Sequence, residues 1–213
     1  SGQWTIPDGY VASKLFKGCL GTNNVEANAR LCMASAVTGF MTSFGLDEPM
    51  GCYEDIDHAD VFVTWGNNMA EMHPVLFSRM LSSRKRRAGV KIIDFATRFT
   101  RTSQAADKTI IFKPQTDLAV ANSICYEIIK NNWVNDNFVN EHVSFHKGKT
   151  NIGYGTEDHF SFTDSAETID FEAFKLFLED YTPEKVEKIS GVPAVEIKYL
   201  ASLYGNPSLK VTS

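Results

Sequence analysis

Cysteine is scarce and widely spaced in this sequence. Its four cysteines, Cys19, Cys32, Cys52 and Cys125, include no Cys-x-x-Cys pair. Zinc knuckles and iron–sulfur loops need closely spaced thiolates, so neither is encoded within this stretch. Four cysteines among 213 residues are also too few for a disulfide scaffold.

Long apolar runs are missing as well. The longest stretch without a charge, residues 31–46, contains several Ser, Thr and Gly residues. A membrane-spanning helix takes about 20 predominantly apolar residues, so this stretch is too short and too polar. No signal peptide, twin-arginine segment or lipidation motif is present. Because the chain starts at Ser1 and ends where residues 209–211 resemble the opening of a strand, we expect an interior piece of a longer protein.

Neither sign of charge dominates, since 26 acidic and 21 basic side chains leave a net charge of −5. With 43% hydrophobic and 12% aromatic residues, the chain can bury a sizeable core, which excludes a disordered or collagen-like protein. Basic residues gather only between residues 79 and 101. Nucleic-acid binding is one interpretation of the run at residues 84–87. We favour the other, in which these cations occupy the last turn of a helix that Gly89 ends.

Strands and helices alternate in the middle of the chain. Buried strands are predicted at residues 60–65, 90–95 and 109–112, and helices at residues 71–87 and 116–131. Such alternation is typical of an α/β fold with a parallel sheet and right-handed crossovers. We therefore divide the chain into residues 1–55, 56–145 and 146–213, with the parallel sheet in the second part.

Additional helices are expected at both ends. The clearest early helix covers residues 29–44, and a late one has Thr182 as N-cap, Pro183 at its first position and Gly191 at its stop. Residues 186–200 have the spacing of a helix-turn-helix. Between residues 182 and 205, however, three lysines balance three glutamates, so this region has little to attract phosphates. We expect a packed helical hairpin.

The residues after the three predicted strands form the first candidate site. Gly66 directly follows a strand, where glycine lets the backbone approach a diphosphate, although G-x-G-x-x-G is absent and an ordinary turn is the alternative. Asp94 lies 28 positions later, farther than the roughly 20 usual for a ribose-binding acid. Asp117 could accept hydrogens from a guanine edge, while helix capping by Thr116 is the alternative there. Three strand ends at one sheet edge favour a nucleotide site.

Cys32 is the second candidate site. It lies near the start of a predicted helix with Arg30 close by, an environment that favours the thiolate. A thiolate suits a heavy metal or serves as a nucleophile. The alternative is a buried cysteine packed among Ala and Met. No histidine lies within 25 residues of Cys32, so no Cys/His dyad is predicted locally.

Four motifs in this order resemble the periplasmic nitrate reductases, which are molybdopterin oxidoreductases of the dimethyl sulfoxide reductase type. The motifs are SGQWT (residues 1–5), NARLCMASA (28–36), DEPMGCY (47–53) and WGNNMAEMHP (65–74). The resemblance implies a Rossmann-like pterin-dinucleotide-binding region and a molybdenum ion held by two molybdopterin guanine dinucleotides. Cys32 matches the family's metal ligand, and Met33 matches the residue that lines the substrate pocket beside it. Leu31 departs from the histidine that many members carry.

The resemblance further implies that nitrate is reduced to nitrite in the periplasm by oxygen-atom transfer. Electrons would come from a cytochrome c type donor subunit through a 4Fe-4S cluster whose ligands lie outside this segment. Neither a nucleic-acid partner nor a membrane span is expected. The cofactor-binding positions that the resemblance implies are Gln3, Asn28, Cys32, Trp65, Gly66, Asn67, Asn68, Met69, Ala70, Glu71, Met72, Ala96, Thr97, Arg98, Phe99, Thr100, Gln115, Thr116 and Asp117.

Three alternatives stay open. An assimilatory nitrate reductase or a formate dehydrogenase would use the same scaffold. In formate dehydrogenases the metal-binding residue is typically followed by His, so Met33 favours nitrate. The third alternative is a nucleotide-binding module without redox chemistry.

Overall fold

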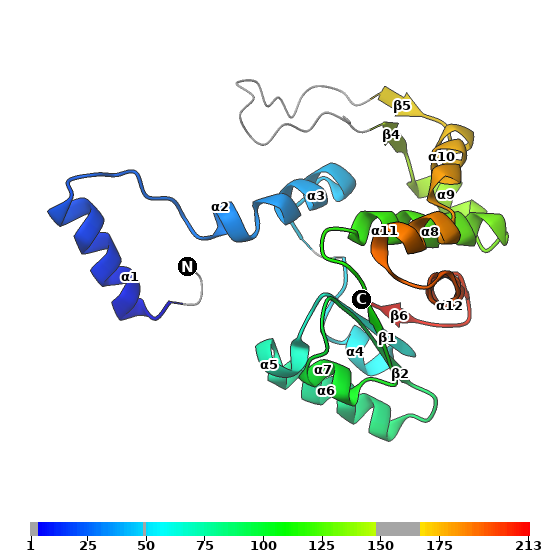
Figure 1. Cartoon of the computed structure of the whole chain (residues 1–213), viewed down its shortest axis with the longest axis horizontal. Helices are drawn as coiled ribbons and strands as arrows, with labels where there is room; N and C mark the ends of the chain where they lie inside the picture. The colour runs from blue at the N-terminus through cyan, green and yellow to red at the C-terminus, as the bar shows by residue number, and fades with distance from the viewer. Residues whose placement is uncertain (1–3, 49, 148–166) are drawn as a thin grey trace. The chain divides into compact units, whose positions relative to one another are not determined.

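The computed structural model describes residues 4–48, 50–147 and 167–213, and of Leu31, Cys32 and Lys147 it describes the backbone alone. The chain divides into two compact units, Ser1–Cys52 and Tyr53–Ser213, which are described separately (Figure 1). No helix among the described residues is long and apolar enough to cross a membrane.

The first unit is helical throughout its described elements. It consists of α1 (Ile6–Ser13), the π-helical η1 (Lys14–Cys19), α2 (Ala29–Cys32) and α3 (Ala34–Phe44). The expectation of one helix over residues 29–44 is wrong, because the backbone leaves the helical region at Met33, with φ −121° and ψ −9°. None of the unit's described residues is buried.

A four-stranded parallel sheet organises the second unit, in the order β3-β2-β1-β6. Its strands are β1 (Val61–Trp65), β2 (Lys91–Ala96), β3 (Lys108–Ile111) and β6 (Val211–Thr212). The three strands expected in the middle of the chain are present, and residues 211–212 add the strand whose opening the sequence indicated. The α/β class with a parallel sheet is therefore confirmed.

Helices cover both faces of this sheet (Figure 1). The described helices of the second unit are α4 (Asp55–His58), α5 (Met69–Met72), α6 (Pro74–Arg86), α7 (Arg101–Ala105), α8 (Asp117–Lys130), α9 (Asp136–His142), α10 (Phe171–Leu178), the 3-10 turn η2 (Glu179–Tyr181), α11 (Pro183–Ser190) and α12 (Ala194–Tyr204). The prediction of one helix over residues 71–87 is wrong. His73 has φ −136° and ψ 58°, since a residue before proline is disfavoured in the helical region, and the chain forms α5 and α6 instead.

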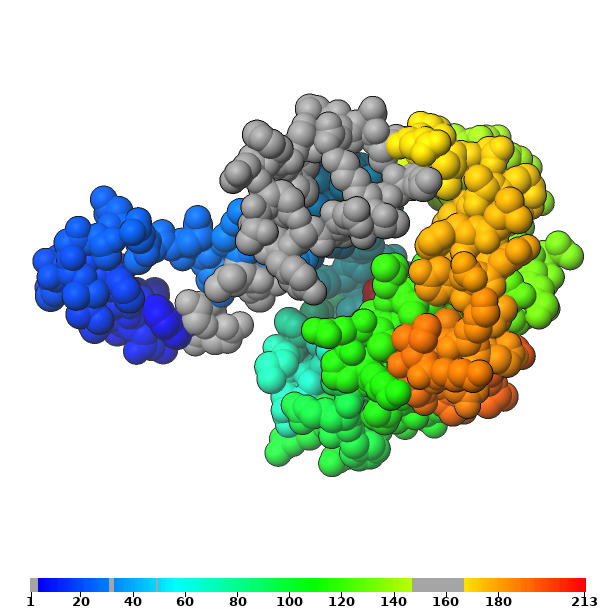
Figure 2. Space-filling view, turned by 45° about the horizontal axis from the view of Figure 1, so that its top comes forward, coloured from blue at the N-terminus to red at the C-terminus, as the bar shows by residue number. Residues whose placement is uncertain are grey.

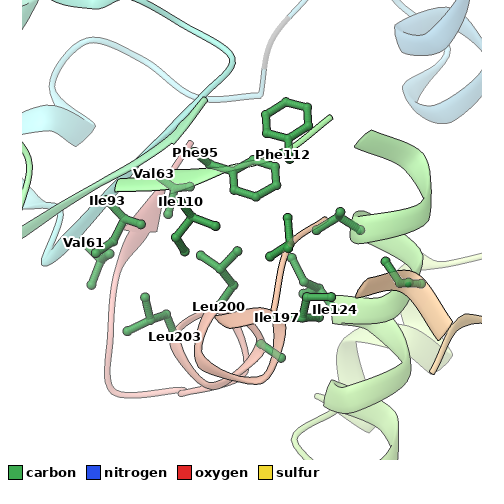
Figure 3. Packing of buried hydrophobic residues seen from close by; sticks show 14 residues of the cluster. Val61, Val63, Ile93, Phe95, Ile110, Phe112, Ile124, Ile197, Leu200 and Leu203 are labelled. Atoms are coloured by element: carbon green, nitrogen blue, oxygen red, sulfur yellow. The ribbon is translucent and has the colours of Figure 1, made fainter. Parts of the chain in front are cut away.

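Alternate residues of the strands enter two separate cores. Val61, Val63, Ile93 and Phe95 pack with α8, α11 and α12 (Figure 3), and the Phe95 ring stacks on Phe112 with centroids 4.3 Å apart. On the other face, Phe62 and Ile92 pack against α4 and α6 in a second cluster. Because side chains alternate along a strand, these buried runs leave neither face of the sheet to solvent.

The helical hairpin expected near the end of the chain is packed, as predicted. Thr182 caps α11 by accepting a hydrogen bond from the Lys185 N–H, and Gly191 ends it with φ 76°. Val186 of α11 and Ile197 of α12 are fully buried in the first cluster. Before this hairpin, α10 and η2 lead into α11 along one surface of the second unit (Figure 2).

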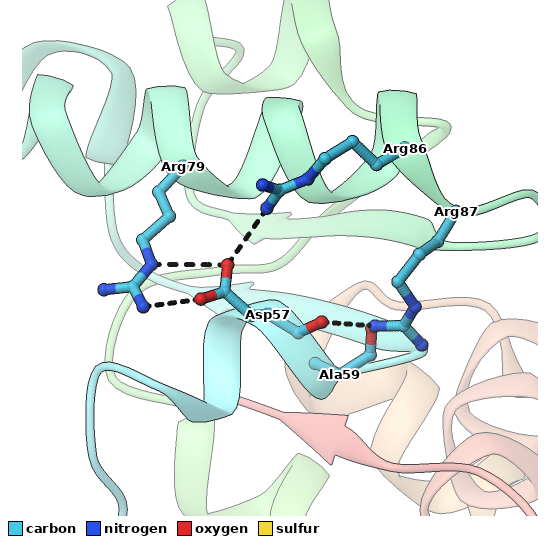
Figure 4. A network of polar contacts seen from close by, with 5 residues as sticks. All are labelled: Asp57, Ala59, Arg79, Arg86 and Arg87. Atoms are coloured by element: carbon cyan, nitrogen blue, oxygen red, sulfur yellow. Dashed lines mark hydrogen bonds and ion pairs between the residues drawn. The ribbon is translucent and has the colours of Figure 1, made fainter.

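The basic run at the end of α6 is paired with acids (Figure 4). Arg79 and Arg86 both contact the Asp57 carboxylate, at 2.6 and 3.2 Å. The hydrogen bond from Arg79 is the main reason why the pKa of Asp57 lies below its usual value. Arg87 donates to the carbonyl oxygens of Asp57 and Ala59. The cations therefore tie the end of α6 to α4 and to the residue that follows it, which supports the helix-end interpretation.

Candidate functional site

A shallow cleft of about 80 Å³ lies at the carboxyl edge of β1 and β2. Its lining residues come from the two loops that follow these strands. They are Gly66, Asn67, Asn68, Ala96, Thr97, Arg98 and Thr100. The cleft is smaller than the roughly 300–1,000 Å³ of a small-molecule pocket, so it suits one group of a larger ligand.

Gly66 makes the turn that opens the first loop. Its φ of 65° is accessible to glycine without strain, and its N–H donates to the Phe95 carbonyl at 2.7 Å. A Cβ at this position would meet no atom within 4 Å, so the backbone conformation rather than space requires glycine. Within the described part of the chain, the N–H groups of Asn67, Thr97 and Arg98 have no acceptor. Unpaired backbone N–H groups are suitable donors for an anion.

The second loop leads into α7, which the sequence analysis did not predict. Thr100 caps this helix and forms a capping box with Ser103, whose hydroxyl accepts from the Thr100 N–H at 2.8 Å. The sequence does contain a signal for the start of α7. Thr100 is followed three positions later by Ser103, and this spacing of two hydrogen-bonding side chains is typical of a capping box. It is easily missed because α7 has only five residues.

Thr102 connects the two loops. Its hydroxyl donates to Asn68 Oδ1 at 3.0 Å and accepts from the Ala70 N–H at 3.0 Å. Asn68 Nδ2 in turn donates to Glu71 Oε2 at 2.8 Å, and Arg101 lies 3.4 Å from the other oxygen of Glu71. The amide side chain of Asn68 is thus engaged within the protein.

Asp94 is buried beneath the loops rather than exposed in the cleft. The residue is 1% exposed, and its carboxylate accepts hydrogen bonds from the hydroxyls of Thr64 and Ser103. Both carboxylate oxygens therefore have partners within the protein. This arrangement agrees with the spacing argument against a ribose contact, and it makes Asp94 the attachment point of α7 to β2.

The third strand end is linked to the first through Trp65. Its indole N–H donates to Asp117 Oδ1 at 3.0 Å, across from β1 to the first turn of α8. Gln115 has φ 68°, a left-handed conformation uncommon outside glycine. Thr116 stands at the N-cap of α8, as the capping interpretation expects, but its side chain makes no cap hydrogen bond. Its hydroxyl donates instead to the Lys113 carbonyl at 2.6 Å.

Several of the expected residues lie elsewhere. Met69 and Ala70 pack against the second hydrophobic cluster, so α5 turns these side chains towards the core. Met72 and Phe99 are exposed and do not line the cleft. The structure thus gathers part of the expected set in one cleft and uses other members for packing.

The remaining expected residues belong to the first unit. Asn28 stands at the N-cap of α2 without a side-chain cap hydrogen bond, and Met33 is exposed. Gln3 and the side chain of Cys32 lie outside what the structure describes. Among the described residues, no group of three or more His, Cys, Asp or Glu side chains is arranged to hold a metal ion. The roles of Cys32 and Met33 stay predictions.

Comparison with known proteins places these features in a wider context. Residues 1–198 match the family described as Molybdopterin oxidoreductase. Among solved structures, acetylene hydratase from Pelobacter acetylenicus is similar, with a TM-score of 0.64 and 19% identity. The match covers 96% of this chain and 24% of that one, so the chain spans about a quarter of the length of that protein. At this identity the likeness shows the fold.

Proposed function

Because the chain belongs to the molybdopterin oxidoreductase family, we propose that it is part of a nitrate reductase with a molybdenum bis(molybdopterin guanine dinucleotide) cofactor. When bound, the metal centre supplies the two-electron chemistry that converts nitrate to nitrite. The protein's part is to bind, orient and tune the cofactor.

The cleft between the β1 and β2 loops carries this proposal. Open α/β sheets bind nucleotides outside the carboxyl ends of their strands. The unpaired N–H groups of Asn67, Thr97 and Arg98 suit the phosphates of a dinucleotide, and the Arg98 side chain brings a positive charge. The small volume fits a diphosphate or ribose group whose remaining parts extend beyond the cleft. The residues present therefore suit the nucleotide end of the cofactor.

Asp117 is the residue we assign to the guanine base. A guanine edge presents neighbouring N–H donors, and a carboxylate accepts both. Trp65 holds Oδ1 of Asp117, which fixes the orientation of the carboxylate. Among the described residues Oδ2 has no hydrogen-bond donor, so it is available to a ligand.

Cys32 is assigned as the molybdenum ligand and Met33 as the residue beside it on the substrate side. Both assignments rest on the motif at residues 28–36. A methionine after the metal cysteine, in place of the histidine of formate dehydrogenases, supports nitrate as the substrate. The 4Fe-4S cluster, the cytochrome c type donor and the periplasmic location follow from the same resemblance and belong to the complete protein.

The test uses the purified complete protein that contains this chain. We expect molybdenum, guanosine monophosphate released by acid hydrolysis, and nitrate reduction with reduced viologen as donor. Cys32→Ser should abolish turnover while the protein remains folded. Asp117→Ala should lower the guanine nucleotide content, because the base loses its acceptor.

The alternatives give different results in the same assays. Turnover of formate but not of nitrate would replace the substrate assignment and leave the cofactor in place. A folded, correctly matured protein that binds a nucleotide but contains no molybdenum would contradict the redox function and leave a nucleotide-binding module.

A further inference from the structure

Three consecutive residues of helix α7 contact two different parts of the second unit, the segment after β1 and strand β2. Arg101 pairs with Glu71 after β1, Thr102 bonds to Asn68 and Ala70 in the same loop, and Ser103 bonds to Asp94 in the middle of β2. The helix therefore holds the loop after β1 against the loop after β2.

Thr102 makes the central contact of this set. It is fully buried, and its single hydroxyl serves as donor to Asn68 and as acceptor from Ala70. The segment it holds, α5, has four residues. A helix of this length is not stable by itself, because ordering the backbone of the first turn costs more free energy than its single hydrogen bond contributes. Its position must come from tertiary contacts such as these.

We propose that Thr102 is a positioning residue for the phosphate groups of the bound nucleotide. By fixing Asn68 and Ala70, it sets the course of the backbone at Asn67, whose N–H group borders the cleft with those of Thr97 and Arg98. The identification of the ligand as a nucleotide rests on the proposed function. The coupling between the two loops rests on the hydrogen bonds alone.

The chemistry of the side chain explains why a hydroxyl is needed at this position. Valine has nearly the shape of threonine but leaves the Ala70 N–H and the Asn68 amide oxygen without a partner. An unpaired polar group near the core costs more than the net value of one hydrogen bond. Serine keeps the hydroxyl, so Thr102→Ser should preserve both contacts.

Ser190 provides a matched control. It is fully buried, its hydroxyl donates to the Val186 carbonyl at 2.8 Å, and it accepts from the Val192 N–H at 3.1 Å. Ser190→Ala thus removes the same two kinds of hydrogen bond from the same unit, but at the end of α11 and not beside the cleft.

The experiment compares Thr102→Val, Thr102→Ser and Ser190→Ala in the complete protein. Two quantities are measured: hydrogen exchange of the backbone at residues 66–72, and the rate at which guanine nucleotide is lost during dialysis. We expect about tenfold faster exchange and about tenfold faster nucleotide loss in Thr102→Val. Thr102→Ser should remain within about twofold of wild type, since its hydroxyl is kept. Ser190→Ala should lower the melting temperature without changing either quantity.

Each contrary outcome has a separate meaning. Wild-type exchange at residues 66–72 in Thr102→Val would overturn the positioning role, and so would equal nucleotide loss in Ser190→Ala. Faster exchange with unchanged nucleotide loss would also overturn it, because the loop would then not govern the ligand. Wild-type protein without any bound guanine nucleotide would defeat the proposed function, while the exchange data would still decide whether Thr102 fixes the loop.

Discussion

The two units of the chain use their apolar residues in opposite ways. In the second unit, two clusters bury strand and helix side chains on both faces of the sheet. In the first unit, Ile6 is 90% exposed, Val11 64% and Phe44 54%, and no described residue is buried. Apolar residues at helical spacing are therefore enough to form α1 and α3 but do not by themselves form a core.

The same contrast separates the two candidate sites. The cleft in the second unit rests on a packed sheet. Thr102 fixes one of its loops by donating to Asn68 and accepting from Ala70, and Asp94 fixes the other by accepting from Ser103. Cys32 and Met33 lie where α2 meets α3, in a unit in which no described residue is buried. A site needs support beneath it to hold its geometry. The cleft has that support within this chain.

The largest expected effect tests the core directly. Phe95→Ala removes a fully buried ring stacked on Phe112, and it should lower the free energy of unfolding by about 3–5 kcal/mol. Phe44→Ala, its counterpart in the first unit, should change it by less than about 0.5 kcal/mol. Urea denaturation measures both. A similar loss for the two variants would show that the first unit has a core after all.

Removal of the buried carboxylate of Asp94 should have the second largest effect on stability. Asp94→Ala leaves the hydroxyls of Thr64 and Ser103 without their acceptor, so we expect a loss of about 2–4 kcal/mol in the same denaturation experiment. Asp94→Asn keeps one acceptor oxygen and should lose less. If Asp94→Ala unfolds at the wild-type urea concentration, the carboxylate does not anchor α7.

Two glycines give effects of opposite sign. A Cβ on Gly205 would lie 2.8 Å from the Trp133 ring, so Gly205→Ala should destabilise the second unit by about 1–3 kcal/mol. Gly39, inside α3, has open space around it, and Gly39→Ala should stabilise that helix by about 0.5–1 kcal/mol. Thermal unfolding followed by circular dichroism compares the two. Destabilisation by Gly39→Ala would reveal close packing in the first unit.

The smallest difference between the two units is expected in how their stability responds to acid. The hydrogen bond from Arg79 keeps the pKa of Asp57 below its usual 3.8, so the carboxylate stabilises the fold above that pH. This contribution is lost as the pH falls through the lowered pKa. Asp57→Asn should therefore flatten the decline in stability below about pH 4. Urea midpoints measured across that range test it.

Asp8 is the corresponding residue of the first unit. Hydrogen bonds from Thr5 lower its pKa as well. Asp8→Asn should leave the acid response of the second unit unchanged. An effect as large as that of Asp57→Asn would mean that the two units unfold together.

Much of the sheet could be predicted from the sequence because its signals are local. Strands of four to six mostly apolar residues, the cap at Thr182 and the glycine after β1 are each specified within a few positions. Since the carboxyl ends of parallel strands share one edge, the place of the cleft followed from the order of the strands. The seven residues lining it are all among those expected.

The predictions were wrong or incomplete where a single backbone angle or a hydrogen-bond partner distant in the sequence determines the local structure. Pro74 lies in the first turn of a helix, as expected, but because of its effect on His73 this helix begins at Pro74 and not at Glu71. Thr102 carries no motif, and its importance comes from partners 32 and 34 positions earlier in the chain. The amphipathic pattern also gave no indication that α3 would begin anew after Met33. Tertiary contacts of this kind are not visible in a local pattern.

The pairing of β6 with β1 has a consequence for the order in which the protein folds. Val61 pairs with Val211, and the Lys210 N–H donates to Asp60 across a separation of 150 residues. Contacts between neighbouring segments close quickly, whereas such a long loop costs more entropy before any contact repays it. During synthesis, β1, β2 and β3 are complete long before β6 leaves the ribosome. The edge of β1 that pairs with β6 therefore stays unpaired until β6 has been synthesised, while the rest of the sheet is already formed.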